Sequence, residues 1–191
     1  MLLVRPYIGA GLLGGSFVRN KLCTTKEALK PVRHAKSATF HAKLKVQLIT
    51  IGKRSGKDAV FDPLVAEYTK RMSNVISISE RSVKRESATA LVAELSKREA
   101  VMLMDEHGPM PRDSIHFSEM IFAALERGGS RLSMIVGDAD GLPLSVLEVQ
   151  NSRVQKVSLS PLTFTHKMAR LFIYEQLYRA TEIRNNSKYH K

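Results

Sequence analysis

The sequence predicts an α/β protein built on one parallel five-stranded sheet with helices on both faces. Short runs rich in apolar and β-branched residues recur from residue 44 onward, and segments with helical periodicity separate them. Neither a linker nor an internal repeat divides this region. Strand–helix alternation of this kind gives a parallel sheet covered by helices, so the alternation alone predicts the fold class.

The first half of this region predicts two strands and two helices. The run LKVQLITI (44–51) contains β-branched residues and ends at the turn-forming GKRSGKD, so it is predicted to be a strand. Apolar residues at helical spacing predict a helix over 59–72, with Pro63 in its first turn. VISIS (75–79) is a short predicted strand. An amphipathic helix follows over 86–99, with Ser87 or Glu86 as its cap.

The second half repeats the pattern. The apolar run at 100–108 closes with a turn, and residues 114–129 form a predicted helix ended by glycine. Residues 131–141 predict a strand that opens onto a glycine-bearing loop. PLSVLEVQNS (143–152) starts a helix with proline in its first position. VQKVSLS (154–160) is the fifth strand, and one long terminal helix follows it.

The carboxyl ends of three predicted strands qualify as a ligand site. They lie after Met104, Val136 and Val157. In open parallel sheets, ligands bind outside the carboxyl ends of the strands. The loop VGDADG after Val136 lacks the glycine spacing of phosphate-binding loops, and two carboxylates in it repel phosphate. A neutral or cationic ligand held by backbone groups fits this loop better, with a plain glycine turn as the alternative.

The positive charge is concentrated at the amino terminus. The chain has 191 residues and a formal net charge of +12, and residues 1–43 contain eight Lys or Arg against one acid. This composition is typical of an organellar transit peptide, mitochondrial first and plastid second. A basic arm that stays attached and touches RNA is the alternative. Residues 44–191 form the folded domain.

Membrane and metal functions are not expected. No apolar run approaches the length of a membrane span. His107, His116 and His166 show no metal-ligand spacing, and the single cysteine excludes a cysteine-rich zinc site.

The terminal helix combines an apolar face with a charged pair. Its apolar face is predicted to contain Ala169, Phe172, Ile173, Leu177, Ala180 and Ile183. Gln176 lies near the middle of that face. Glu175 and Arg179 are four residues apart and can form an ion pair beside it.

Residues 44–191 contain the stretches LKVQLITIGKR, LMDEHG, IVGDADGL, VSLSPLTFTHKMARLFIYEQLYRA and the terminal KYHK. On these stretches the region resembles the RlmH enzymes of the SPOUT superfamily, which methylate N3 of a pseudouridine in large-subunit ribosomal RNA. The last two stretches are the most specific. The resemblance implies an α/β sheet with a C-terminal trefoil knot, a homodimer, and S-adenosylmethionine bound by the knot loops. The cofactor-binding residues that it implies are Met104, Gly137, Asp138, Gly141, Leu159, Ser160, Pro161, Leu162, Thr163, Phe164, Thr165 and Glu175.

The resemblance also implies a role for the last residues of the chain, which we call the tail. In the family, the tail of one subunit completes the site of the partner subunit. The residues implied in methyl transfer are His166, Arg179, Tyr189 and His190. The residues expected to contact ribosomal RNA phosphates are Arg170, Arg184, Lys188 and Lys191. Lys191 stands where the family has arginine, which keeps the cation and loses a bidentate phosphate contact.

One departure from the family pattern leaves two functions open. Asp138 stands where the family loop has a second glycine that approaches the cofactor. The first function is an active organellar methyltransferase for large-subunit ribosomal RNA. The second is a catalytically weak or inactive homologue that binds ribosomal RNA as an assembly factor of the mitochondrial ribosome.

Overall fold

A computed structural model of the chain describes residues 43–52, 56 and 58–190. The predicted amino-terminal extension therefore lies outside the described residues, apart from Lys43. Lys191 lies outside them as well.

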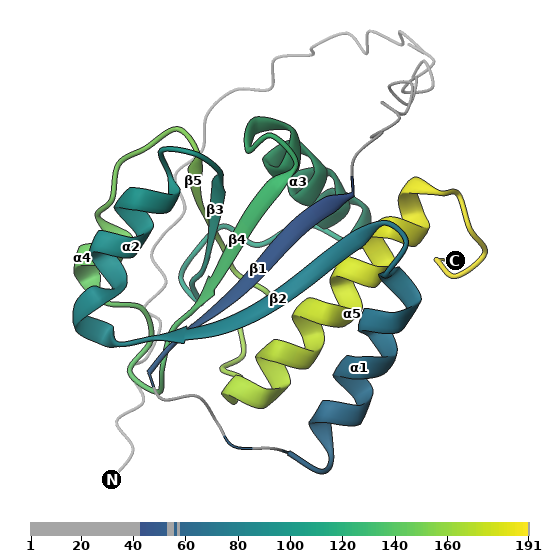
Figure 1. Ribbon diagram of the computed structural model, residues 1–191, viewed down its shortest axis with the longest axis horizontal. Helices are drawn as coiled ribbons and strands as arrows, with labels where there is room; N and C mark the ends of the chain where they lie inside the picture. Colours follow the sequence, from purple (N-terminus) through teal and green to yellow (C-terminus); the bar gives the residue numbers. More distant parts are fainter. Residues whose placement is uncertain (1–42, 53–55, 57, 191) are drawn as a thin grey trace, which may run out of the picture. The chain divides into compact units, whose positions relative to one another are not determined.

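The described residues form the predicted α/β fold (Figure 1). The strands are β1 (Leu44–Ile51), β2 (Ile76–Val83), β3 (Ala100–Met104), β4 (Arg131–Val136) and β5 (Val154–Val157). The helices are α1 (Phe61–Met72), α2 (Ala88–Leu95), α3 (Ser114–Arg127), α4 (Leu144–Leu147) and α5 (His166–Arg184), with a 3-10 turn at Arg85–Ser87. All pairings are parallel, and the strand order is β2-β1-β4-β3-β5. The predicted fold class is thus confirmed, while the trefoil knot stays a prediction.

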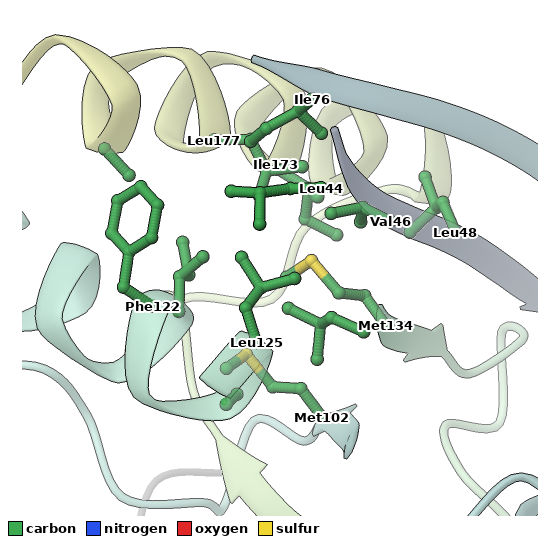
Figure 2. Close-up of a cluster of buried hydrophobic side chains, with 14 of the residues drawn as sticks. Leu44, Val46, Leu48, Ile76, Met102, Phe122, Leu125, Met134, Ile173 and Leu177 are labelled. Atoms are coloured by element: carbon green, nitrogen blue, oxygen red, sulfur yellow. The ribbon is translucent and has the colours of Figure 1, made fainter. Parts of the chain in front are cut away.

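Helices cover both faces of the sheet. On one face, α1, α3 and α5 pack together, and Figure 2 shows part of the core between the sheet, α3 and α5. Ile173 and Leu177 of α5 and Leu125 of α3 are fully buried there. On the other face, α2 and α4 cover a smaller core that includes Ile49, Val101 and other apolar side chains. A fully buried leucine or isoleucine side chain contributes about 1.5–3 kcal/mol, so the larger core accounts for most of the packing energy.

The two strands β1 and β2 are amphipathic. Leu44, Val46 and Ile76 are buried under the helices of the larger core, whereas Lys45 and Ser77 on the opposite face are exposed. Successive side chains of a strand point to opposite faces, which explains the alternation. One part of this parallel sheet therefore presents a polar face to solvent.

Two helices and two strands differ clearly from the prediction; strand β5, predicted over 154–160, ends at Val157. Helix α2 begins at Ala88, so Ser87 occupies the N-cap position as one alternative predicted, but its side chain makes no capping hydrogen bond. Helix α4 has four residues, far fewer than predicted, because the chain turns after Glu148 and Val149 packs against the smaller core. Strand β2 continues to Val83, since its whole length pairs with β1.

The buried face of α5 is rotated from the predicted one. Its buried residues are Ile173, Tyr174, Leu177, Ala180 and Thr181. Phe172 is 37% exposed and packs on Phe164, with ring centroids 4.9 Å apart. Phe172 of α5 therefore packs against the loop before the helix rather than in the core.

Candidate functional site

Three neighbouring strand ends surround one cavity of about 860 Å³. Met104 of β3 is in register with Val136 of β4 on one side and with Val157 of β5 on the other. Since the three strands are adjacent and parallel, their following loops emerge at the same edge of the sheet. The volume suits a ligand of cofactor size.

The loop after β4 is tightly closed. Gly141 has φ +73° and donates its N–H to the carbonyl of Asp138 at 3.0 Å. A Cβ on Gly137 would lie 2.4 Å from the carbonyl carbon of Gly141. Only glycine fits at position 137, because the backbone returns directly over it.

Asp138, the departure from the family pattern, is held by an arginine from another loop. The Arg85 guanidinium donates to the Asp138 carboxylate at 2.5 Å and to the Gly141 carbonyl at 3.0 Å. The Asp140 N–H donates to the same carboxylate at 3.1 Å. The residues with positive φ in the described part of the chain do not include Asp138, so its backbone is unstrained. We define the Arg85–Asp138–Gly141 contacts as the loop clamp.

The electrostatics of the clamp favour an ionised Asp138. Desolvation raises the pKa of its carboxyl, but the hydrogen bonds from Arg85 and from the Asp140 N–H and the nearby charges of Arg85 and His166 outweigh it. The net result is a pKa below the usual value. Asp138 is therefore a carboxylate with its negative charge compensated at the mouth of the cavity.

The loop after β5 forms the opposite wall. Ser158 donates its hydroxyl to the Ser160 carbonyl at 2.9 Å, and the Leu162 N–H donates to the Ser160 hydroxyl at 3.0 Å. Thr163 donates to Glu106 at 3.1 Å, which ties this loop to the one after β3. Local side chain–backbone bonds of this kind fix an irregular loop.

His166 lies at the rim of the cavity as the first residue of α5. Thr165 caps the helix and accepts a hydrogen bond from the Met168 N–H at 3.4 Å. Of the residues predicted to bind the cofactor, the structure brings all but Pro161 and Glu175 to this cavity.

A second polar cluster, the tail cluster, lies at the other end of α5. It consists of Glu175, Arg179 and Tyr189. One oxygen of Glu175 accepts two hydrogen bonds from Arg179, at 2.6 and 2.9 Å, and one from the Tyr189 hydroxyl at 3.2 Å. The Arg179 guanidinium also lies 4.8 Å from the centre of the Tyr189 ring. The predicted Glu175–Arg179 pair is confirmed.

The contacts within the tail cluster shift the pKa of its tyrosine. Burial and the charge of Glu175 raise the pKa of Tyr189 to about 12, so the phenol stays protonated at neutral pH. His190 is adjacent, and its buried Nδ1 has no hydrogen-bond partner among the described residues. The end of the chain is thus packed on α5, with one buried imidazole nitrogen that has no partner among the described residues.

Within one chain, the tail cluster and the cavity are separate. His166 and Arg179 are thirteen residues apart on one helix, about 20 Å at 1.5 Å per residue. The four residues implied in methyl transfer are therefore divided, with His166 at the cavity and the other three at the far end of α5.

The residues predicted to contact RNA have different surroundings. Arg170 donates to Glu80 at 2.8 Å and to Asp62 at 2.7 Å, and Tyr174 donates to the same Glu80 at 2.7 Å. The Arg184 guanidinium lies 4.2 Å from the centre of the Phe122 ring, and Lys188 is exposed. The positive charge of Arg170 is thus compensated by two acids.

The described part of the chain contains neither a metal-ligand cluster nor a membrane-spanning helix. No group of three or more His, Cys, Asp or Glu side chains is arranged there to hold a metal ion. None of its helices has the length and apolarity needed to cross a membrane.

Sequence reasoning missed Arg85. It lies 53 positions before Asp138, and no spacing pattern connects the two. The only available signal was the carboxylate at position 138, which required a partner.

Comparison with known proteins gives consistent matches. The family described as "Predicted SPOUT methyltransferase" matches residues 44–190. A protein of Protochlamydia amoebophila named "Ribosomal RNA large subunit methyltransferase H" is 51% identical over 75 residues, which are 39% of this chain and 51% of that protein. A protein of the same name from Prochlorococcus marinus is 34% identical over 47% of this chain and 75% of its own length.

A third relative is matched along its full length. The protein of that name from Anaeromyxobacter sp. (strain K) is 32% identical over 160 residues, covering 78% of this chain and all of the relative. The first alignment spans about half of its relative, whereas this one spans the whole domain. The family match covers every described strand and helix, and on that basis the chain belongs to the SPOUT methyltransferase family.

Proposed function

We propose that this protein is a homodimeric, S-adenosylmethionine-dependent methyltransferase that modifies a pseudouridine of large-subunit ribosomal RNA in an organelle. The mitochondrion is the first choice and the plastid the second. The observation that carries the proposal is the cavity at the ends of β3, β4 and β5 in a chain of the SPOUT family. The names of the three relatives support ribosomal RNA as the substrate.

The residues around the cavity fit the cofactor. Apolar side chains such as Leu142, Leu159 and Phe164 offer surfaces for an adenine ring, and backbone groups of the loops offer hydrogen bonds. Among the described residues, the lining contains four acids, Asp105, Glu106, Asp138 and Asp140, and neither lysine nor arginine. An acidic cavity in a chain of net charge +12 favours a ligand that carries a positive charge, such as a sulfonium.

The separation of the tail cluster from the cavity supports the homodimer. Arg179 is ten residues beyond Ala169, the last residue of α5 that lines the cavity, which is about 15 Å along the helix, and Tyr189 follows the end of α5. A second copy that brings its tail to the first copy's cavity would complete the site. This arrangement is also what the family resemblance implies.

The proposed chemistry is a direct displacement. When held by the loops after β3, β4 and β5, S-adenosylmethionine would supply a methyl group to N3 of the base, which would lose its N3–H proton in exchange. The protein's contribution is to orient the base and to accept or stabilise the proton lost from N3. His190, whose Nδ1 has no hydrogen-bond partner among the described residues, is the proposed acceptor once the tail moves into the partner's site, and Arg179 stabilises the developing negative charge on the base.

The second candidate is an inactive ribosomal RNA-binding assembly factor. Asp138 favours it, because a carboxylate lies in the cavity wall where the family resemblance implies a glycine. The loop clamp argues for the active enzyme, since Arg85 compensates the charge and the backbone at Asp138 is unstrained.

Calorimetric titration of the full chain with S-adenosylmethionine tests the proposal. An active enzyme binds at micromolar concentration, which corresponds to about −8 kcal/mol. Absence of heat, together with an unmethylated target nucleotide and protein bound to ribosomal precursors, would select the assembly factor. If Asp138→Gly restored S-adenosylmethionine binding, the loop after β4 would be identified as the cause of its loss.

A further inference from the structure

We propose that a basic groove at the amino-terminal ends of β1, β2 and β4 binds the phosphate backbone of RNA. The groove is defined by Lys45, Gln47, Ser77, Ser79, Arg81 and Arg131, and its volume is about 450 Å³. The inference rests on the proposed ribosomal RNA substrate and adds a surface to it, at the opposite end of the sheet from the cofactor cavity.

The first observation is that this part of a parallel sheet is open. Parallel sheets are normally covered on both faces, and their strands read as continuous apolar runs. Here Lys45, Ser77, Ser79, Arg81 and Arg131 are exposed, while their neighbours on the other face, such as Val46 and Leu132, are buried. Core packing therefore does not explain the polar side chains on this face of the sheet.

The second observation is the way the side chains are placed. Lys45 of β1 pairs in register with Ser77 of β2 and with Arg131 of β4. Neighbouring strands are about 4.8 Å apart, so two cations and a hydroxyl lie side by side. Residues of the next row, Gln47 and Ser79, add an amide and a second hydroxyl. These groups are typical donors to phosphate and sugar oxygens in nucleic-acid complexes.

The third observation is the charge balance. Arg98, also in the groove, pairs with Glu94 at 3.1 Å, and Glu99 accepts a hydrogen bond from Ser133 at 2.8 Å. Among the residues that the structure describes, no ion pair involves Lys45, Arg81 or Arg131. Three exposed cations without acidic partners favour a polyanion.

Charge complementarity favours RNA, rather than the chain's own amino-terminal segment, as the occupant of the groove. Residues 1–43 contain eight Lys or Arg against one acid, so the groove repels them. From Arg131 to Val136 is about 17 Å along β4 at 3.3 Å per residue, so RNA in the groove lies well outside the cofactor cavity. The groove then anchors a part of the RNA distant from the modified base.

The test compares two full-length variants of equal charge. Lys45→Gln/Arg131→Gln removes two groove cations, and Lys70→Gln/Lys156→Gln removes two exposed cations elsewhere. The probe is fluorescein-labelled poly(U), followed by anisotropy over a range of salt concentrations. We expect the groove variant to bind about tenfold more weakly, with a salt slope lower by about 1.4, and the control to change far less.

Further variants and probes make every outcome decisive. Lys45→Arg/Arg131→Lys is expected to bind as tightly as wild type, and Arg81→Gln alone is expected to weaken binding. Equal affinities of groove and control variants would overturn the proposal. So would a groove variant that loses poly-L-glutamate but keeps poly(U), which would indicate an acidic protein partner.

The outcome is separable from that of the proposed function. S-adenosylmethionine affinity of the groove variant is expected to equal that of wild type, and its KM for ribosomal RNA to rise with little change in kcat. If wild type bound poly(U) through the groove but took up no S-adenosylmethionine, the groove would stand and the enzyme function would fall.

Discussion

The two ends of helix α5 are surrounded by different kinds of residues. At its beginning, His166 lies among glycine-bearing and serine-bearing loops, where backbone groups and short side chains set the geometry. At its far end, long side chains converge on one carboxylate, that of Glu175. The first arrangement shapes a cavity, whereas the second orders the end of the chain. A single chain thus contains two separate parts of the proposed site.

The largest effect is expected from Gly137→Ala at the cavity end. The added Cβ would lie 2.4 Å from the carbonyl carbon of Gly141 and 2.6 Å from the Leu142 nitrogen, so the loop must open. We expect cofactor affinity to fall by about 100-fold, or about 2.7 kcal/mol. Titration calorimetry measures the change. Gly56→Ala is the matched control, because nothing lies within 4 Å of its added Cβ.

The next effect is expected from Arg179→Ala at the tail end. The change removes both hydrogen bonds to Glu175 and the contact with the Tyr189 ring. We expect methyl transfer to slow by about 100-fold, the scale of losing a charge-stabilising donor, with cofactor affinity retained. Single-turnover kinetics and calorimetry measure the two quantities. Arg71→Ala is the control, since Arg71 also lies over the ring of Tyr178. Loss of cofactor affinity in Arg179→Ala would contradict the division between the two ends.

A smaller effect is expected from the loop clamp. Arg85→Ala leaves the Asp138 carboxylate in the cavity wall without its cation. We expect cofactor affinity to fall by about three- to tenfold, within the range of a partly exposed charged hydrogen bond. Asp138→Asn and the double variant complete a cycle whose coupling energy measures the pair. Arg98→Ala is the control, because its pair with Glu94 is exposed and distant. Additive effects of the two changes would refute the clamp.

The smallest effect concerns acid stability. The hydrogen bonds from Lys167 and from the Phe61 and Val60 N–H groups lower the pKa of Asp58 from 3.8 to about 2. A folded-state pKa below the unfolded one stabilises the fold above the unfolded value, and the stabilisation is lost as pH falls through the folded value. Melting temperature is therefore expected to decline as pH falls from about 4 to 2. Lys167→Gln should decline less steeply over that window, and an unchanged profile in this variant would contradict the assignment.

Local patterns predicted the sheet well, because each strand has its own signature. LKVQLITI and RLSMIV carry their strand character within a few residues, and Gly128 ends α3 as expected. The three strand ends could be placed together for the same reason, since parallel strands share an edge. The predictions were therefore correct for strands and helix ends whose structure depends on residues close together in the sequence.

Contacts between separate elements explain which residue surroundings the sequence did not predict. Phe172 looked like a core residue by helical periodicity, yet the Phe164 ring in the preceding loop packs on it. Arg170 looked like a phosphate ligand, yet Glu80 and Asp62, far away in sequence, pair with it. The Arg85–Asp138 pair and the open polar face of β1 and β2 also depend on which strands become neighbours. Such contacts follow from topology and carry no local signal.

The strand order has a consequence for how the chain assembles. Strand β3 pairs only with β4 and β5, both of which follow it in the sequence. A nascent chain that has not yet reached Arg131 can pair β1 with β2, but leaves the apolar run Ala100–Met104 without a partner. Closing such non-local pairings is slow, and unpaired apolar strands aggregate. We therefore expect the domain to complete its folding only after synthesis of β5, with the unpartnered segment a natural target for chaperones.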